Sequence, residues 1–460
     1  MGMLQKVYDA SPLPFQNLMT TVSGFQKNRT RYGRTYWDHR DWLKQYDKWS
    51  LEQKLEHQDA LTRNFVLYAA NNSPFYRDLY AEVDLDSVSG VESLQRLPLV
   101  DKEDLRVNAD RVRTIPRKGA VEGHTGGTTG KSLTVLNHPA DSMRRMATLD
   151  HFKARVGFEN RRMRRATFMG KHIVPPGRET EDLWRYNAAT RQMLYSSFHL
   201  TEENLGRYVD SLNRFQPKAL DGFFMSMVDV ASFILRHEID LSFRPIAAFP
   251  TSETVTPSGR DLIERAFKTK VYDQYASSEG APFVTECSAG TLHIEPHSGV
   301  FEHREAGSGE VLVTSFTTHG TPLIRYAIGD SMIFGPSEAC SCGISSPTVA
   351  LIEGREDDFL YTPKGARINA GDVANLFKNI PSSLIRAQLV QQSLSEVTAL
   401  LEVDPASYQS VHDDLLRDEF RHKFGRDSRL LIQHVKDMPR AASGKHRLIV
   451  NNLAGKRYAI

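Results

Sequence analysis

The sequence predicts an α/β protein with a large N-terminal α/β domain and a small C-terminal α+β domain. In the middle of the chain, strand-like runs alternate with helical runs, an order that builds a sheet covered by helices. Past residues 357–358 the pattern changes to two strand-like runs, one helix and a further strand. A chain of 460 residues is also too long for one compact core. We therefore predict domains at residues 1–355 and 356–460.

About the first 110 residues are predicted to form a helical arm of the large domain. Apolar residues recur at helical spacing from Ser50 to about Asn71, with Ser50 as the N-cap, and Pro74 follows the end of that helix. Before this helix, aromatic and charged residues are mixed, which is typical of an arm packed on a core. The aromatic residues of this segment are Phe15, Phe25, Tyr32, Tyr36, Trp37, Trp42, Tyr46 and Trp49.

A loop rich in glycine and threonine follows at residues 124–132, with the sequence His-Thr-Gly-Gly-Thr-Thr-Gly-Lys-Ser. Glycine lets backbone amides approach a ligand closely, threonine adds hydroxyl donors, and Lys131 adds a positive charge. Together these groups suit a polyphosphate. A P-loop would need glycine five positions before Gly130, where Thr125 stands, and no apolar strand leads into the loop. The count therefore excludes a P-loop.

A strand and a basic run follow the glycine loop. Residues 133–136 have strand character, and six basic residues lie between Lys153 and Arg165. We interpret the basic run as a solvated helix face, and binding of coenzyme A phosphates or of an anionic acceptor is its functional alternative.

The central region continues the alternation of helices and strands. Residues 220–234 are predicted to be a loop that leads into a helix, and residues 246–249 a short strand. Thr256 caps a helix through Phe267, with proline in its first turn. The later predicted elements are strands at 270–273, 310–316, 387–390, 397–403 and 429–435 and a helix at about 408–424.

Composition excludes several classes of function. The formal net charge of +2 argues against a nucleic-acid partner. No apolar run approaches the roughly 18 residues of a membrane-spanning helix. The start of the chain lacks the apolar core of a signal peptide, and Lys6 stands where a myristoylation motif needs serine or threonine. We therefore expect a cytoplasmic protein, and a dimer is compatible with the sequence.

Six motifs stand in the order found in adenylate-forming enzymes, which the chain therefore resembles. These enzymes form acyl-AMP from ATP and a carboxylic acid. One motif differs from the usual family pattern, because alanine replaces the glycine that commonly follows its tyrosine. The six matching stretches are His124–Ser132, Ser252–Thr254, Tyr275–Glu279, Tyr326–Asp330, Gly354–Asp358 and Pro439–Lys445.

Further residues narrow the resemblance to the phenylacetate–CoA ligase-like group. Leu97-Pro98 with Lys102, residues 72–77, and the cysteine pair before Gly-Ile-Ser are similar to that group. Within it, the chain resembles the capsular-polysaccharide-associated subgroup over about residues 50–460. This similarity rests on residues 168–173, 184–187 and 198–201.

The resemblance implies a role for each matched position. The glycine loop would hold the β- and γ-phosphates, and Thr128 would also assist catalysis. Glu279 would be catalytic by holding Mg²⁺, a hard cation that prefers oxygen ligands. Tyr275 would offer its ring to adenine, while Asp330 and Arg355 would contact the ribose hydroxyls. The implied nucleotide-binding residues are Thr125, Gly126, Gly127, Thr128, Thr129, Gly130, Lys131, Ser252, Glu253, Tyr275, Ser277, Asp330 and Arg355.

Lys445 matches the mobile lysine that reaches the substrate carboxylate and the α-phosphate during adenylation. It lies in the small domain, so it would enter the site only when that domain closes. Asp357 matches the hinge about which the domain would rotate to admit a thiol. The implied walls of the acid pocket are Phe223, Phe224, Met225 and Ala276, with packing in the core as the alternative for these aromatic residues.

The three cysteines suggest a structural metal site. Cys287, Cys340 and Cys342, with His293, would supply three sulfurs and one imidazole, a common zinc ligand set. Some phenylacetate–CoA ligase-like proteins carry such a site. His297 and His303 are alternative imidazole ligands, and three unrelated reduced cysteines are the alternative to a metal site.

The predicted function is an ATP-dependent ligase that transfers the acyl group to a thiol, most simply coenzyme A. The first alternative is an amide ligase that uses an amine acceptor in polysaccharide or natural-product assembly, and a carrier-protein thiol is a further acceptor. The second alternative is a nucleotide-binding protein without catalytic activity. No motif identifies the carboxylic acid.

Overall fold

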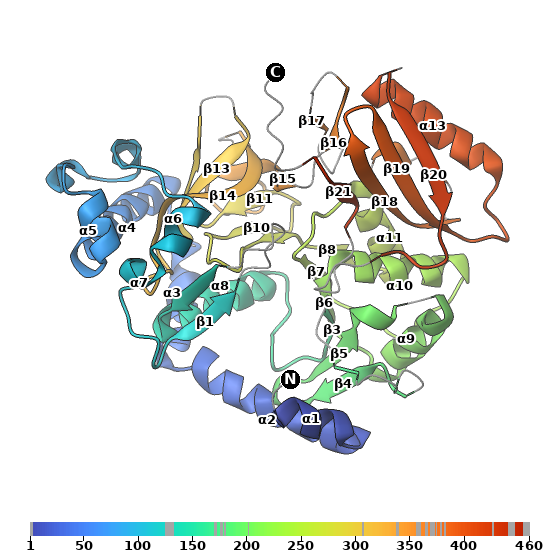
Figure 1. Cartoon of the computed structure of the whole chain (residues 1–460). Coiled ribbons are helices and arrows are strands. Elements are labelled where there is room, and N and C mark those ends of the chain that lie inside the picture. The colour runs from blue at the N-terminus through green and yellow to red at the C-terminus, as the bar shows by residue number, and fades with distance from the viewer. Residues whose placement is uncertain are drawn as a thin grey trace. The chain divides into compact units, whose positions relative to one another are not determined.

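The structure of the chain is a computed structural model whose described part excludes several segments. It describes residues 3–124, 133–169, 173–174, 178, 181–200, 202–305, 308–336, 340–355, 360–363, 367–368, 373, 375–377, 380, 383–425, 427–439 and 447–453. The chain forms two compact units. Unit 1 comprises Met1–Val22, Arg161–Val271 and Glu353–Ile460, and unit 2 comprises Ser23–Asn160 and Tyr272–Ile352. Figure 1 labels most elements of both units.

Unit 1 contains a mostly parallel sheet in the strand order β4-β5-β3-β6-β7-β8. Only β4, at one edge, runs antiparallel to its neighbour. Its strands are β3 (Arg165–Met169), β4 (Trp184–Asn187), β5 (Gln192–Ser196), β6 (Ala219–Phe223), β7 (Ala247–Thr251) and β8 (Lys270–Val271). Its connecting helices are α9 (Glu202–Phe215), α10 (Phe224–Arg236) and α11 (Pro257–Phe267). The predicted alternation of strands and helices is confirmed here.

Strand β6 corrects the prediction of a loop at the start of residues 220–234. Asp221-Gly222 resembles a turn, but Asp221 is buried and forms an ion pair with Arg165 at 3.0 Å, so its charge is compensated inside the sheet. Gly222 has φ +111, and a β-carbon there would lie 1.9 Å from the carbonyl oxygen of Phe168. Only glycine allows β6 to approach β3 this closely.

The C-terminal part of unit 1 is an α+β element, as the sequence predicts. Its four-stranded sheet has the order β20-β19-β18-β21 and is covered by α13 (Ser410–Phe424). The strands are β18 (Leu384–Ser393), β19 (Glu396–Val403), β20 (Arg429–His434) and β21 (Ile449–Asn451), with a separate pair β16 (Leu360–Tyr361) and β17 (Arg367–Ile368). The predicted boundary between residues 355 and 356 stays a prediction.

Unit 2 contains a seven-stranded sheet within the described residues, in the order β12-β13-β14-β15-β11-β10-β9. The strands are β9 (Gln274–Tyr275), β10 (Val284–Glu286), β11 (Leu292–Ile294), β12 (Gly299–His303), β13 (Glu310–Ser315), β14 (Leu323–Phe334) and β15 (Thr348–Arg355). A separate hairpin joins β1 (Val121–His124) and β2 (Thr134–Asn137). The helices are α3 (Arg34–Tyr46), α4 (Leu51–Asn72), α5 (Pro74–Leu79), α6 (Lys102–Val107), α7 (Ala109–Val112) and α8 (Pro139–Arg155).

The caps of two helices follow their local sequences. The Ser50 hydroxyl accepts a hydrogen bond from the Gln53 amide, and the Gln53 side chain accepts from the Ser50 amide, so both orphan donors at the start of α4 are satisfied. Thr256 caps α11 through a hydrogen bond from the Gly259 amide to its hydroxyl. Both caps were predicted, because they depend only on neighbouring residues.

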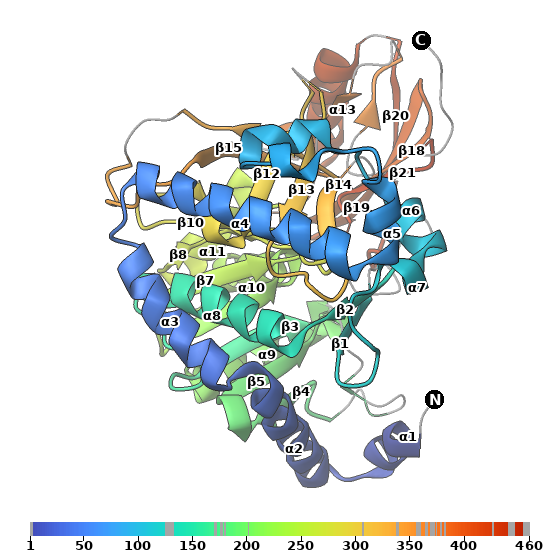
Figure 2. The same ribbon diagram turned by 90° about the vertical axis from the view of Figure 1, so that its left-hand side faces the viewer.

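The N-terminal helices only partly pack as predicted. Helices α1 (Met3–Ala10) and α2 (Leu13–Arg31) precede α3 (Figure 2). Trp42, Tyr46 and Trp49 pack on one another and on His57, as expected of an arm. In contrast, Phe15 and Phe25 are exposed to solvent. No helix in the described part of the chain is both long enough and apolar enough to cross a bilayer.

The basic run that begins at Lys153 is not one solvated helix face, so that interpretation is wrong. Arg155 of α8 is largely buried and binds two carboxylates. Its guanidinium donates to Asp47 and to Glu295, each at 2.5 Å, and His151 lies 2.7 Å from the same Asp47 carboxylate. The partners of Arg155 and His151 come from distant parts of the sequence. The local sequence therefore indicated a solvated helix face.

This network predicts a loss of stability in acid. Burial alone would raise the pKa of Asp47, but the hydrogen bonds from His151 and Arg155 outweigh burial and lower it to about 2. Burial would likewise raise the pKa of Glu295, but Arg155 holds it well below its ordinary value. Both folded-state pKa values lie below the unfolded ones. The stabilisation is therefore complete above about pH 4.5 and is lost as the pH falls toward 2.

We expect Asp47→Asn to lower the free energy of unfolding by about 2 kcal/mol at neutral pH and to have a smaller effect near pH 3. Unfolding midpoints measured across this pH range give the comparison. Asp41→Asn is the control, because that carboxylate is exposed and pairs with Lys44 on the same helix. An equal loss for Asp47→Asn at both pH values would contradict the assignment.

Candidate active site and metal centre

The β1–β2 hairpin brings the ends of the glycine loop close to a second predicted motif. His124 pairs with Thr134 across the hairpin, so these strands bracket residues 125–132, which lie outside the described residues. A β-carbon placed on Gly123 would lie 3.5 Å from the carbonyl oxygen of Ser278. Gly123, just before the loop, therefore lies beside the Tyr275–Glu279 stretch within unit 2.

Tyr275 and Asp330 form a direct pair. The Tyr275 hydroxyl donates to a carboxylate oxygen of Asp330 at 2.5 Å, across 55 positions of sequence. Asp330 is buried in β14, whereas Tyr275 at the end of β9 is half-buried. The ring of Tyr275 also packs edge-on against Phe301. Two of the predicted nucleotide-binding residues are thus brought together.

Glu279 is buried at the end of the same stretch, with 3% of its surface exposed. The Ser278 hydroxyl donates to its carboxylate at 3.2 Å. The Ser277 hydroxyl accepts from the amides of Gly280 and Ala281, which fixes the turn that carries Glu279. Ala276 is exposed in this turn.

Arg145 of α8 supports this turn and was not predicted from the sequence. Its guanidinium donates to the carbonyl oxygens of Gly280 and Ala281 at 2.8 and 2.9 Å and lies over the ring of Phe283. Burial lowers the pKa of Arg145 to about 10. Nothing in the local sequence distinguishes this arginine from Arg144 beside it, because its partners are 135 and 136 positions away.

In unit 1, the carboxyl ends of β6 and β7 carry further predicted residues. Phe223 and Thr251 pair at the end of these parallel strands. Ser252 follows with φ 70, a strained conformation for a residue other than glycine. The Glu253 carboxylate accepts from the Met225 amide at 2.8 Å in the first turn of α10, where a negative charge is favoured.

The predicted walls of the acid pocket have different environments. Phe224 is fully buried and packs against Gly259 of α11, so its side chain belongs to the core. Phe223 and Met225 are half-buried. Arg355 is the last residue of β15. The predicted residues that lie outside the described part of the chain are Thr125, Gly126, Gly127, Thr128, Thr129, Gly130, Lys131, Asp357 and Lys445.

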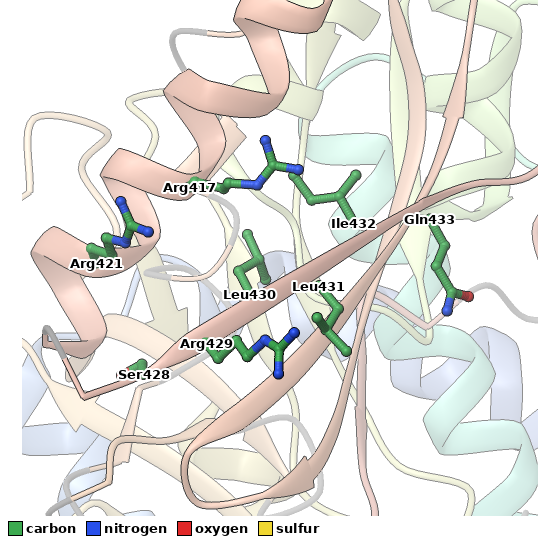
Figure 3. A pocket seen from close by; sticks show the side chains of 8 residues that line it. All are labelled: Arg417, Arg421, Ser428, Arg429, Leu430, Leu431, Ile432 and Gln433. Carbon is green, nitrogen blue, oxygen red and sulfur yellow. The ribbon is translucent and has the colours of Figure 1, made fainter.

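A pocket of about 550 Å³ lies on the C-terminal part of unit 1, and none of its lining residues is a predicted site residue (Figure 3). It is lined by strand β20 and by Arg417 and Arg421 of α13. Each arginine has a carboxylate neighbour on its own helix, Asp414 for Arg417 and Asp418 for Arg421. We assign no role to this pocket.

The predicted metal ligands converge in unit 2. The sulfur of Cys287 lies 3.7 Å from that of Cys340, and the sulfur of Cys342 lies 3.5 Å from Nε2 of His293. All four ligand atoms lie within 4.8 Å of one another. A disulfide would require a sulfur separation near 2 Å. His293 is therefore the imidazole of this cluster, whereas His297 packs against Trp42 and Tyr46.

The cluster has supporting contacts. Nδ1 of His293 lies 3.1 Å from the Ser346 hydroxyl, which leaves Nε2 facing the sulfurs. The amide of Ile344 donates to the sulfur of Cys342, and Cys340 contacts Thr291. His293 and Cys287 are buried, whereas Cys340 and Cys342 are half-buried.

Comparison with known proteins agrees with this architecture. Residues 360–452 match the family model of the CapK C-terminal domain. Protein CapK of Staphylococcus aureus is 33% identical over 454 residues, which cover 98% of this chain and 100% of that protein. Phenylacetate-coenzyme A ligase of Thermus thermophilus is 24% identical over 79% of this chain and 84% of its own length.

Among solved structures, 2-hydroxyisobutyryl-CoA ligase in complex with R3-HIB-AMP superposes with a TM-score of 0.71. The match covers 88% of this chain and 91% of that chain, at 16% sequence identity. The fold is therefore that of the adenylate-forming ligases. Within this class, the chain belongs to the CapK family, and the predicted resemblance is confirmed.

Proposed function

We propose that this protein is an ATP-dependent ligase that activates a carboxylic acid as acyl-AMP, with release of pyrophosphate. The acyl group then passes to a thiol, most simply that of coenzyme A. The observation that carries the proposal is the hydrogen bond between Tyr275 and the buried Asp330. This hydrogen bond places residues of two motifs side by side. The aromatic ring of Tyr275 could contact a base, and the carboxylate of Asp330 could accept hydrogen bonds from ribose hydroxyls.

Two neighbouring features support the same proposal. Gly123, which precedes the glycine loop in the sequence, lies beside Ser278, next to the buried carboxylate of Glu279. Glu279 would hold Mg²⁺, which neutralises phosphate charge when bound. Thr128 and Lys131 would hold the phosphates, with Arg145 keeping the Glu279 turn in place.

The reaction and its acceptor can be tested together. The protein is incubated with ATP and a panel of carboxylic acids, and pyrophosphate release is measured in the presence and in the absence of coenzyme A. A thioester formed only when coenzyme A is present supports the proposal. If an acid triggers pyrophosphate release from ATP but no thioester of coenzyme A forms, the proposed acceptor changes to a carrier-protein thiol or an amine. Binding of ATP without pyrophosphate release across the panel would favour a non-catalytic nucleotide-binding protein.

Asp330→Asn provides the site-specific arm of this test. In the variant, one acceptor oxygen of the carboxylate is replaced by an NH2 group that can only donate, so we expect ATP use to fall while the fold is preserved. Asp414→Asn is the matched control, because Asp414 is an exposed carboxylate on α13. Equal activity of the two variants would remove Asp330 from the proposed site.

We also propose that the Cys287, His293, Cys340 and Cys342 cluster holds structural Zn²⁺. With Zn–S near 2.3 Å and Zn–N near 2.0 Å, the edges of a tetrahedron are about 3.8 Å between sulfurs and about 3.5 Å between sulfur and nitrogen. The separations of 3.7 and 3.5 Å match these edges. Four protein ligands would leave no open position, which favours a structural role over a catalytic one.

We expect elemental analysis of the purified protein to give one zinc ion per chain. A strong chelator should lower the unfolding midpoint by several degrees, because it removes a ligand that binds only the folded state. His293→Asn should lose most of the metal. His303→Asn is the control, because that imidazole packs on Phe334 outside the cluster. Zinc well below one equivalent in the unaltered protein would end this proposal.

A further inference from the structure

Helix α2 carries an apolar stripe on its solvent-facing side. The stripe consists of Phe15, Leu18, Val22 and Phe25, which are 46%, 53%, 48% and 58% exposed. Spacings of three and four residues place these side chains on one face of the helix. In the preceding helix α1, Leu4 and Val7 are also exposed, three positions apart.

The opposite face of α2 is held to unit 1 by polar contacts. Gln16 is fully buried, and its side-chain oxygen accepts from Arg185 at 2.6 Å. Asn17 accepts from the amide of Tyr186 at 2.9 Å, and Thr21 accepts from the amide of Ala188 at 3.1 Å. A helix of a soluble globular protein normally turns its apolar side inward. Here polar side chains face the protein and large apolar side chains face outward.

Within the sequence segment that carries the stripe, all charges have one sign, although Glu181 and Asp182 share a pocket with Leu13 at the start of α2. Between Ser11 and Trp37 the sequence contains four lysine and arginine residues and no aspartate or glutamate. The four are Lys27, Arg29, Arg31 and Arg34. The carboxylates nearest in sequence are Asp9 and Asp38, and Asp38 pairs with Arg34 at 3.5 Å in an exposed i,i+4 pair that salt screens readily.

We propose that α2 is a docking surface for an anionic lipid bilayer. An interfacial helix buries an apolar face at the boundary between headgroups and acyl chains, while its cations attract anionic headgroups. Helix α2 carries both an exposed apolar face and cations, which include Arg29 and Arg31 in its last turn. A second copy of the chain is a poorer partner, because a two-fold interface would bring identical acid-free, positive segments together. The surface requires no membrane-spanning helix and is independent of the proposed ligase activity.

Flotation of the full-length protein with lipid vesicles tests the proposal. We expect binding to vesicles containing phosphatidylglycerol, weaker binding to pure phosphatidylcholine vesicles, and a decrease with added salt. The triple variant Phe15→Ser, Leu18→Ser and Phe25→Ser should bind about a hundredfold more weakly or not at all, since each side chain loses apolar burial. Arg29→Gln with Arg31→Gln should reduce binding to phosphatidylglycerol vesicles and leave binding to phosphatidylcholine unchanged.

The matched control removes three exposed apolar side chains elsewhere, with Leu99→Ser, Val107→Ser and Val411→Ser, which are 43%, 61% and 51% exposed in the original chain. It should bind vesicles like the unaltered protein. Equal loss in both triple variants, or no binding of the unaltered protein to phosphatidylglycerol vesicles, would overturn the proposal. A lipid-free dimer that only the stripe variant dissociates, without vesicle binding, would assign the stripe to a second copy instead. Circular dichroism of each variant shows whether the fold is retained.

Discussion

Lys445→Ala should abolish acyl-adenylate formation and leave thioester formation from synthetic acyl-AMP nearly intact. In the first half-reaction, a carboxylate attacks the α-phosphate of ATP, so two negative groups approach each other. A lysine that reaches both groups offsets the charge where it develops in the transition state. Removing one such donor costs about a hundredfold to a thousandfold in rate. In the second half-reaction the acyl-phosphate bond is already formed, so we expect that Lys445 is not required.

The two half-reactions can be measured separately. Pyrophosphate release reports adenylation, and coenzyme A consumption with synthetic acyl-AMP reports acyl transfer. Lys436→Ala is the control, because Lys436 is an exposed lysine in the same C-terminal part of the chain. A variant that loses both half-reactions equally would refute this role for Lys445.

Arg386→Met should destabilise the protein more than any exposed charge substitution. The Arg386 guanidinium donates to Asp229 of α10 at 2.7 Å, to Glu402 of β19 at 2.9 Å and to the carbonyl oxygen of Leu200 at 2.7 Å. The side chains of this ion triad are at most 4% exposed. Burial alone would lower the pKa of Arg386, but the two carboxylates raise it above its ordinary value. The arginine is therefore charged and compensated.

Removing the arginine leaves two buried carboxylates without their cation, which typically costs about 3–5 kcal/mol in the free energy of unfolding. Chemical denaturation of the variant measures this loss. Arg421→Met is the control, because Arg421 is 61% exposed and 3.8 Å from Asp418, and we expect it to cost under about 0.5 kcal/mol. Adding Asp229→Asn and Glu402→Gln to Arg386→Met should restore part of the stability. No recovery would contradict the electrostatic explanation.

The triad also offers a test of the domain rotation that the family resemblance implies. Arg386 and Glu402 pair across β18 and β19, whereas Asp229 belongs to helix α10. A rotation of residues 356–460 would separate Arg386 from Asp229, so Arg386→Met should change the ratio of the two half-reaction rates. An unchanged ratio would mean that this contact persists through the reaction.

Local sequence was sufficient to predict a structural feature wherever the residue that stabilises it is a near neighbour in the chain. Ser50 and Thr256 cap their helices through residues three positions away, and both helices were predicted with their starts. The glycine loop could be separated from a P-loop by counting from Gly130. The six motifs also identified the fold class, because their order is a property of the sequence itself.

Sequence alone was insufficient to predict the environment of a residue whose partner lies far along the chain. Asp221-Gly222 looked like a turn, but Arg165 compensates the charge of Asp221 inside a sheet. Phe15 and Phe25 were predicted to belong to an arm packed on a core, but both are exposed, and α2 packs on the rest of unit 1 through polar side chains such as Gln16 and Asn17. Arg145 could not be distinguished from its neighbour, because the carbonyls that it holds are more than a hundred positions away.

The sequence by itself therefore determined the class of this protein, its helix caps and the set of residues to test, since these depend on residue types and short spacings. Only the tertiary structure decided that Tyr275 meets Asp330, that His293 joins the three cysteines, and that Arg386 bridges two carboxylates. Such contacts depend on burial, which raises the cost of an unpaired charge and makes each distant partner necessary.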